Sequence, residues 1–126
     1  MRILVDTHVF LWWRADAPEL PLRFRRELGN PENEVLVSAA AAWEIVIKRA
    51  LGRLEFEGSV AAAVAEEGFT PLGVTLAHVD EVAALPDLHR DPFDRLLVAQ
   101  ARREGLVLAT RDPFIRKYEG VDLLSP

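Results

Sequence analysis

The sequence contains no cysteine. Disulfide bonds, thiolate metal sites and cysteine nucleophiles are therefore excluded, and the absence fits a reducing compartment. Long apolar stretches are also missing, since none approaches the ~20 residues that a membrane helix needs. The first apolar run, residues 3–5, stops at Asp6 and does not have the pattern of a signal peptide. We therefore expect a soluble, cytoplasmic protein with no membrane segment.

Several chemical signatures are absent as well. The sequence has no Gly-rich phosphate loop, no Gly-x-Ser-x-Gly elbow and no His-Glu-x-x-His helix. Its three histidines form no metal-ligand pattern: His8 could touch a site at Asp6, and we expect His78 and His89 to be surface or structural residues. The net charge of −5 argues against non-specific coating of nucleic acid, although an enzyme with a local basic groove remains compatible.

The 126 residues, half of them hydrophobic, predict one compact domain over residues 1–126. Short apolar runs at 3–5, 35–37 and 106–109 are typical of strands buried on both faces. Helical patterns alternate with them, and a further edge strand is expected at 121–124. The helices are expected at 7–13, from about 18 to 29, and at 39–51, 59–67, 75–85, 91–104 and from 112. This order predicts an α/β fold with a parallel sheet flanked by helices on both sides.

Acidic residues follow the predicted strands. Asp6 comes directly after the first, Asp112 lies within three residues of the last apolar run, and Glu44 lies on the helix after the second. Asp94 lies in the first turn of the helix that opens at Asp91. Because ligands bind beyond the carboxyl ends of parallel strands, these carboxylates could meet at one end of the sheet. Such a cluster repels itself unless a divalent cation such as Mg²⁺ or Mn²⁺ lies within it, which favours phosphodiester hydrolysis.

Each acid also has a structural alternative. Asp6 could cap the next helix, and Asp94 could be a first-turn carboxylate stabilised by the helix dipole. For both, the apolar surroundings favour a functional role, because a lone buried charge is costly. Glu44 precedes Lys48 by four residues, so spacing alone leaves a surface ion pair equally open. For the two acids that precede a proline, spacing alone favours helix capping: Asp91 and Asp112.

Four segments together resemble PIN-domain ribonucleases, in particular the VapC-type toxins of VapBC toxin–antitoxin systems. They are the segment 4–13, which begins Leu4-Val5-Asp6-Thr7-His8-Val9-Phe10, the segment 38–48 around Trp43-Glu44, the segment 89–101, which begins His89-Arg90-Asp91-Pro92-Phe93-Asp94-Arg95, and the segment 108–118 around Arg111-Asp112-Pro113-Phe114. The third is the most specific. The resemblance covers nearly the whole chain in the family's order.

This resemblance implies a PIN fold with an acidic pocket and Mg²⁺- or Mn²⁺-dependent endonucleolytic cleavage of RNA. The three central acids of the family fall on Asp6, Glu44 and Asp94, and the more variable fourth falls on Asp112. Asp6 and Asp94 are the first choice as metal ligands. Glu44 would ligate metal or orient water, and Asp112 would complete the pocket.

Further positions follow from the resemblance and from charge. Thr7 and Thr110 match small hydroxyl residues beside the acids, where they could bond to a carboxylate or water. Basic residues gather in the last third of the chain, and some could contact RNA phosphates. The candidates are Arg90, Arg95 and Arg111, with a solvated helix face as the alternative.

The resemblance also implies protein partners. A small VapB-like antitoxin would lie across the acidic pocket through a basic tail, and homodimerisation is usual in the family. Phe10, Trp12, Trp13 and Trp43 could supply apolar contacts at such interfaces, with core packing as the alternative.

Other functions stay open at this point. A PIN-like module could grip RNA or protein without cutting. Another α/β phosphate hydrolase could use Asp6 as its nucleophile, although His8 stands where such enzymes usually place a second aspartate. An antitoxin-type DNA-binding regulator is disfavoured, because no helix-turn-helix pattern or basic ribbon is present.

Overall fold

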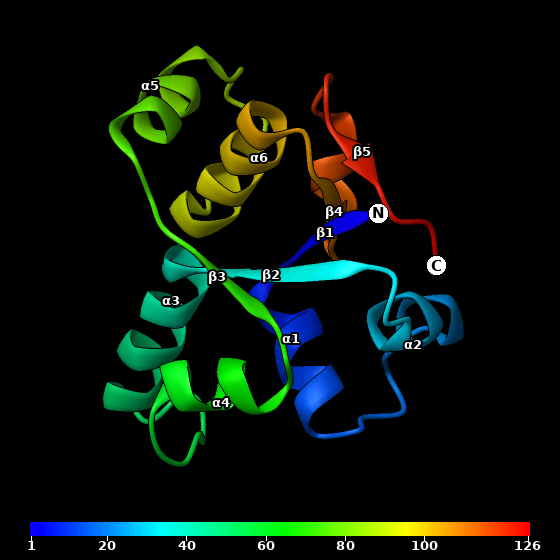
Figure 1. The fold of residues 1–126 in the computed structure, drawn as a ribbon. Coiled ribbons are helices and arrows are strands. Elements are labelled where there is room, and N and C mark those ends of the chain that lie inside the picture. The colour runs from blue at the N-terminus through cyan, green and yellow to red at the C-terminus, as the bar shows by residue number, and fades with distance from the viewer.

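A computed structural model describes residues 1–126 and contains a five-stranded, wholly parallel sheet with helices on both faces (Figure 1). The strand order is β3-β2-β1-β4-β5. The strands are β1 (Arg2–Val5), β2 (Glu34–Ser38), β3 (Thr70–Leu72), β4 (Val107–Ala109) and β5 (Asp122–Leu123). The predicted α/β fold is confirmed.

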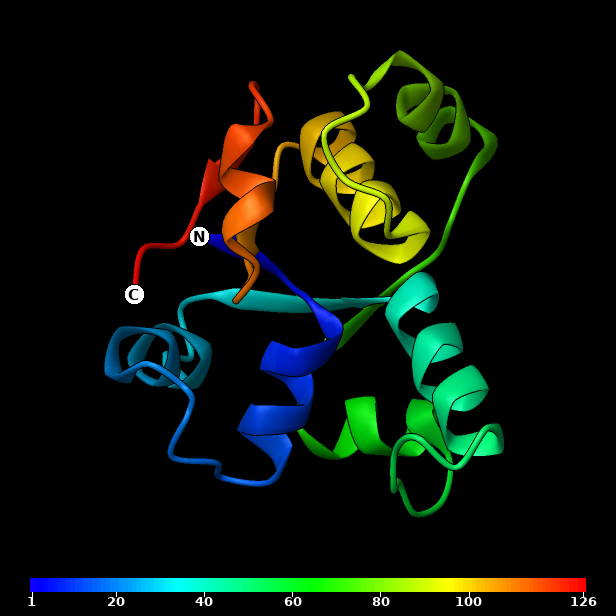
Figure 2. The same cartoon turned by 180° about the vertical axis from the view of Figure 1, so that it is seen from behind.

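Two groups of helices cover the two faces of the sheet, as Figures 1 and 2 show from opposite sides. One face carries α1 (Thr7–Arg14), α2 (Leu22–Gly29), α3 (Ala39–Ala50) and α4 (Val60–Glu66). The other face carries α5 (Leu76–Ala84), α6 (Pro92–Glu104) and the 3₁₀ helix η1 (Pro113–Lys117), drawn in orange. None of these helices is long and apolar enough to cross a membrane.

The apolar strands divide their side chains between two cores. Ile3 and Val5 pack with α1–α4, whereas Leu4 between them packs with α6 and η1. In β2, Leu36 lies on the same side as Leu4. Alternate residues of a strand point to opposite faces, so a central strand covered on both sides must be apolar throughout. This explains why these strands are continuous apolar runs.

Strand β3 was missing from the sequence-based prediction. It has only three residues, and Pro71 occupies its centre. Proline cannot donate a ladder hydrogen bond, so within sheets it is tolerated mainly on edge strands. Here β3 is an edge strand that pairs only with β2, in the register Leu36–Thr70. Its side chains are partly exposed, which removes the apolar signal that revealed the other strands.

The sheet places the carboxyl end of β1 at its centre. Strand β2 pairs with one side of β1, and β4 pairs with the other. The chain runs first toward β2 and β3 and only later returns to β4 and β5, so the strand order reverses beside β1. Such a reversal opens a crevice at the carboxyl ends of the strands. The backbone N–H of Asp6 donates to the carbonyl of Ala109 at 2.9 Å, which aligns Asp6 with the segment after β4.

Candidate active site

Asp6 is fixed in the crevice by backbone and hydroxyl donors. Its side chain is only 3% exposed, and one oxygen accepts the Val9 N–H at 2.8 Å as the N-cap of α1. The other oxygen accepts the Thr110 hydroxyl at 2.6 Å and the Arg111 N–H at 3.1 Å. Burial raises the pKa of Asp6 although these donors oppose the shift. Asp6 therefore caps a helix and also presents a buried carboxylate to the crevice.

Asp94 and Asp112 meet through His89. The Nε2 atom of His89 lies 3.0 Å from an Asp94 oxygen and 2.8 Å from an Asp112 oxygen. One potential ligand atom from each of the three residues lies within 4.8 Å of the others. The loop before α6, the first turn of α6 and the start of η1 thus converge on one point. Spacing alone favoured capping for Asp112, and the structure shows it in both roles: one oxygen caps η1 at Phe114 N–H and the other contacts His89.

The electrostatics of this cluster favour a positive group. Burial raises the pKa of Asp94 to about 7, and the charges of Asp91 and Asp6 add to the rise. Burial would lower the pKa of His89, but hydrogen bonds and charges from Asp112 and Asp94 outweigh it and raise that pKa. The pKa of Asp112 is lowered because the Phe114 N–H and His89 outweigh its partial burial. The anionic form of Asp94 is therefore disfavoured by burial first and by its acidic neighbours second.

Glu44 lies slightly apart from this cluster. It is 3% exposed on α3, accepts a hydrogen bond from the Thr7 hydroxyl and pairs with Lys48 at 2.7 Å. The i,i+4 pair that the spacing suggested is present, but its carboxylate is buried rather than on the surface. Thr7 follows Asp6 directly, so Glu44 is linked to the crevice through the start of α1. The group of ligand atoms within 4.8 Å does not include Glu44 or Asp6.

Three sequence expectations concern a helix cap and two histidines. Asp91 accepts the N–H groups of Phe93 and Asp94 and caps α6, as its position before Pro92 predicted. His89 was expected to be a surface or structural residue, and the structure instead places it between two acids. The signal that could have identified it is its place two residues before the cap of the helix that carries Asp94. His78 is buried and structural as expected, bonded to Thr75 N–H and Glu104.

The three candidate RNA-contacting arginines differ in their surroundings. Arg90 and Arg111 are exposed at the rim of the crevice, and Arg111 lies 3.2 Å from His8 Nε2. The guanidinium of Arg95 donates to the carbonyls of Pro86 and Val82 and to the Tyr118 hydroxyl. Arg95 therefore braces the loop before α6 and has few donors left for a ligand. Burial, followed by the charge of Arg111, lowers the pKa of His8.

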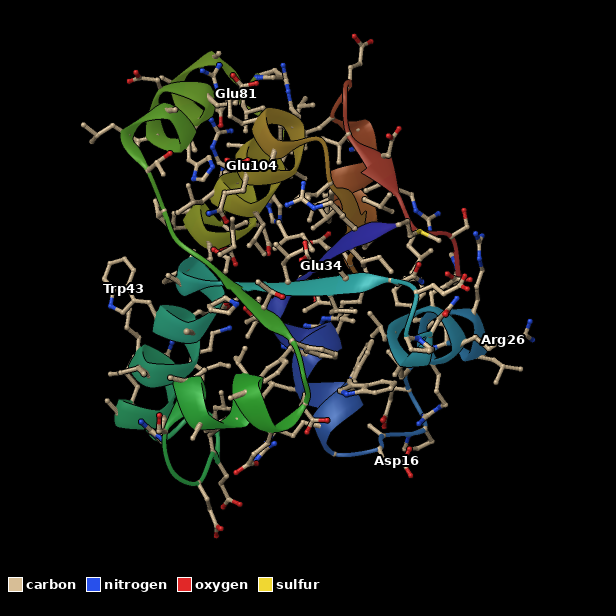
Figure 3. The ribbon with its side chains drawn as sticks, in the orientation of Figure 1. Asp16, Arg26, Glu34, Trp43, Glu81 and Glu104 are labelled. Carbon is tan, nitrogen blue, oxygen red and sulfur yellow. The ribbon has the colours of Figure 1, made fainter.

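The aromatic residues considered for interfaces also separate into two groups. Phe10 is fully buried in the core, and Trp12 and Trp13 are partly buried against it. Trp43 is 62% exposed and projects from α3 at the edge of the molecule (Figure 3). Only Trp43 of these four is free to make a substantial contact with another molecule.

The donor set of the crevice fits a divalent cation. Carboxylate oxygens are the ligands that Mg²⁺ and Mn²⁺ prefer, and an imidazole beside them is compatible with Mn²⁺. The pKa of Asp94 is raised by burial first and by the charges of Asp91 and Asp6 second, and a bound cation would offset both effects. His89, a basic side chain, already lies between Asp94 and Asp112, where positive charge is favoured. Asp94 and Asp112 could therefore hold an ion, with Asp6 beside them.

Comparison with known proteins agrees with this architecture. The parallel sheet and the acidic crevice are typical of α/β proteins that act on phosphates, and residues 3–121 match the family described as "PIN domain". The chain belongs to the PIN-domain family. Among curated proteins it is similar to "Ribonuclease VapC22" of Mycobacterium tuberculosis, at 27% identity over 92% of this chain and 91% of that protein.

Solved structures share the fold at low sequence identity. VapBC2 from Rickettsia felis, bound to a DNA fragment from the promoter, has a TM-score of 0.72 and 13% identity, over 98% of both chains. FitAcB from Neisseria gonorrhoeae has a TM-score of 0.64 and 20% identity, over 98% of this chain and 97% of that one. The fold and family implied by the sequence motifs are therefore confirmed.

Proposed function

We propose that this chain is a metal-dependent endoribonuclease that acts as the toxin of a type II toxin–antitoxin pair. One observation carries the proposal: Asp94 and Asp112 converge on His89, and the buried Asp6 at the end of β1 lies near enough for its charge to act on Asp94. The name of its mycobacterial relative describes a ribonuclease. Similar folds occur in complexes described as VapBC or toxin–antitoxin assemblies.

Different residues of the crevice would have different roles around the phosphate. Asp94 and Asp112, with Asp6 beside them, would hold Mg²⁺ or Mn²⁺, which would supply an activated water and offset charge on the phosphate. Thr110 and the Arg111 N–H keep the Asp6 carboxylate oriented. Glu44 lies farther along the crevice, where Thr7 and Lys48 hold its carboxylate in position to orient water.

Positive charge at the rim suits a polyanionic substrate. Arg90 and Arg111 are exposed beside the acidic cluster and are the candidates for contacting phosphates on either side of the cut. Arg95 is assigned a bracing role, because its guanidinium already has three acceptors. With arginines on either side of the acidic cluster, the RNA backbone would be oriented so that the phosphate to be cleaved lies at the acidic cluster.

The surroundings of Asp6 disfavour a phosphatase with an aspartate nucleophile. Both Asp6 oxygens accept hydrogen bonds, and the carboxylate is almost completely buried. An attacking carboxylate oxygen must reach the phosphorus atom, whereas a metal ligand needs only a remaining lone pair. Trapping of a covalent phosphate on Asp6 would favour this rival.

Two protein partners complete the proposal. A small antitoxin with an Arg- or Lys-bearing tail would neutralise the acidic crevice, since opposite charge favours encounter and register. Homodimerisation would use the exposed apolar residues at the edge of the molecule formed by α3 and α5, which include Trp43, Leu76 and Val79. Sedimentation of the purified chain would test for the dimer, and coexpression with the gene immediately upstream would test whether that gene encodes the antitoxin.

Cleavage of a mixed single-stranded RNA pool by purified, antitoxin-free protein tests the proposed activity. We expect cutting with Mg²⁺ or Mn²⁺, none with EDTA, and none by a folded Asp94→Asn variant. The Arg26→Gln variant is a matched control, because Arg26 lies on α2 at the other side of the molecule (Figure 3) and should leave cutting unchanged. Cutting in EDTA, or by the Asp94→Asn variant, would contradict the proposal.

A further inference from the structure

A hollow of about 460 Å³ adjoins the acidic cluster. It lies between the loop before α6 and the start of η1, and its lining residues are Asp87, Leu88, His89, Arg90 and Phe114. His89 belongs to both places, because the same imidazole that lines the hollow contacts Asp94 and Asp112. A ligand in the hollow would therefore be next to a phosphate held at the acids.

Phe114 lines this hollow, and its side chain is not part of the packing of either hydrophobic core. The residue is 52% exposed and belongs to neither hydrophobic core, whereas Ile115 and Tyr118 anchor η1 in the core. The centroid of the His89 ring lies 6.0 Å from that of Phe114, and the two rings are inclined at 39°. The Lys117 Nζ lies 4.9 Å from the centroid of the Phe114 ring. An aromatic ring thus lies between the acidic cluster and a cation.

We infer that Phe114 is a stacking platform for the nucleobase of single-stranded RNA next to the phosphate that is cut. This inference rests on the proposed function and assigns a substrate subsite to it. Unpaired bases stack on aromatic side chains, and this stacking is tolerant of sequence because every base has a π-face. Bases within a duplex are already stacked on each other, so this platform favours single strands.

The charges around the hollow favour a nucleotide over an apolar protein side chain. Leu88 and Phe114 are its only hydrophobic lining residues, and both are exposed. Arg90 lines the hollow and Lys117 lies over the ring, so cations are available for the phosphates that flank a stacked base. The acid Asp87 also lines the hollow, but its side chain is 97% exposed at the rim.

Binding of fluorescein-labelled RNA tests the platform directly. The probes are a short single-stranded RNA of mixed sequence and the same backbone with abasic sites, measured by anisotropy with the Asp94→Asn protein to prevent cutting. Adding Phe114→Leu should weaken binding of the RNA with bases by about fivefold to a hundredfold. It should leave binding of the abasic RNA unchanged. Adding Phe114→Tyr, which keeps the ring, should restore binding.

Controls separate this inference from the proposed function. Leu51→Ala removes a similarly exposed apolar side chain at the far end of α3 and should have no effect. Equal losses for both RNAs, or no loss with Phe114→Leu, would overturn the platform. If wild-type protein cuts RNA while Phe114→Leu binds normally, only the platform fails. If wild-type protein cuts no RNA and the Asp94→Asn protein binds none, both the proposed function and the platform fail.

Discussion

The two sides of the acidic crevice hold their carboxylates in different ways. On the β1 side, Asp6 is bonded to two backbone N–H groups and the Thr110 hydroxyl, none of which titrates near neutral pH. On the α6 side, Asp94 has only a histidine as side-chain partner and faces repulsion from Asp91 and Asp6. The first side is organised by the fold itself, whereas the second depends on positive charge. A cation bound in the crevice would therefore complete the second side and would find the first side already in place.

The largest expected effect contrasts alanine substitutions on the two sides. Asp6→Ala and Asp94→Ala should each reduce cleavage by about a thousandfold or more, because each removes a carboxylate from the proposed cation site. Their effects on metal-free stability at pH 8 should differ in sign. Asp6→Ala leaves buried donors unpaired and should cost about 1–3 kcal/mol, whereas Asp94→Ala relieves repulsion and should raise the Tm.

Thermal unfolding in EDTA, with cleavage assays on the same proteins, checks this contrast. Equal destabilisation by the two substitutions would show that both carboxylates are held alike and that the two sides of the crevice do not differ.

The support for Asp6 can be weakened without removing its charge. Thr110→Val deletes the hydroxyl that donates to Asp6 and accepts the Asp112 N–H at 3.0 Å. Changes in residues that orient metal ligands typically cost 10–100-fold in affinity or activity, and we expect a loss of about that size in kcat/KM. Thr70→Val on the edge strand β3 is the matched control and should retain wild-type activity. An unaffected Thr110→Val enzyme would remove Thr110 from the site.

The shifted pKa values in the crevice should make the stability of the metal-free protein depend on pH. The pKa of Asp94 is raised to about 7, so its contribution to stability is complete below the unfolded value near 4 and is lost as pH rises through 7. The pKa of His89 is also raised, so its contribution is lost as pH rises past 6.5. The pKa of Asp6 is also raised by burial and acts in the same direction, so these groups together predict that the free energy of unfolding in EDTA falls between pH 5 and pH 8.

Chemical unfolding at several pH values measures this fall. His89→Asn should raise the pKa of Asp94 further, because His89 lowers that pKa, and should reduce cleavage by about tenfold, because Asp94 and Asp112 lose their shared partner. A wild-type stability that rises across the same range would refute the assigned role of the α6 side.

The smallest effect concerns the helix cap beside the site. Asp91→Ala removes the acceptor for two N–H groups of α6 and should cost about 1 kcal/mol of stability. Because the charge of Asp91 raises the pKa of Asp94, that pKa should fall in the variant. Cleavage should change only slightly, whereas Asp112→Ala, which also removes a cap, should lose most activity. Similar cleavage by both variants would show that Asp112 is only a cap.

The sequence predicted most of the fold because burial on both faces leaves a simple pattern in β1, β2 and β4. The sequence did not predict β3, because a proline and partial exposure of the side chains remove that pattern there. Asp6 and Asp94 were proposed as site residues because Asp6 directly follows a strand and Asp94 lies in the first turn of a helix, whereas Glu44 and Asp112 were assigned only through the resemblance to the PIN-domain family. His89 was not predicted, because it lies in a loop whose path depends on tertiary contacts such as those of Arg95 with Pro86 and Tyr118. Spacing along the chain carries no information about such contacts.

Calorimetric titration of Mn²⁺ into the metal-free protein tests the central claim, that this crevice is a cation site completed on its α6 side. The wild-type protein should bind more tightly at pH 8 than at pH 6 and should release protons on binding at pH 6, because Asp94 must give up its proton. The Asp94→Asn variant should lose this binding, and Arg26→Gln should retain it. Equal Mn²⁺ affinity in the wild-type and Asp94→Asn proteins would contradict the claim.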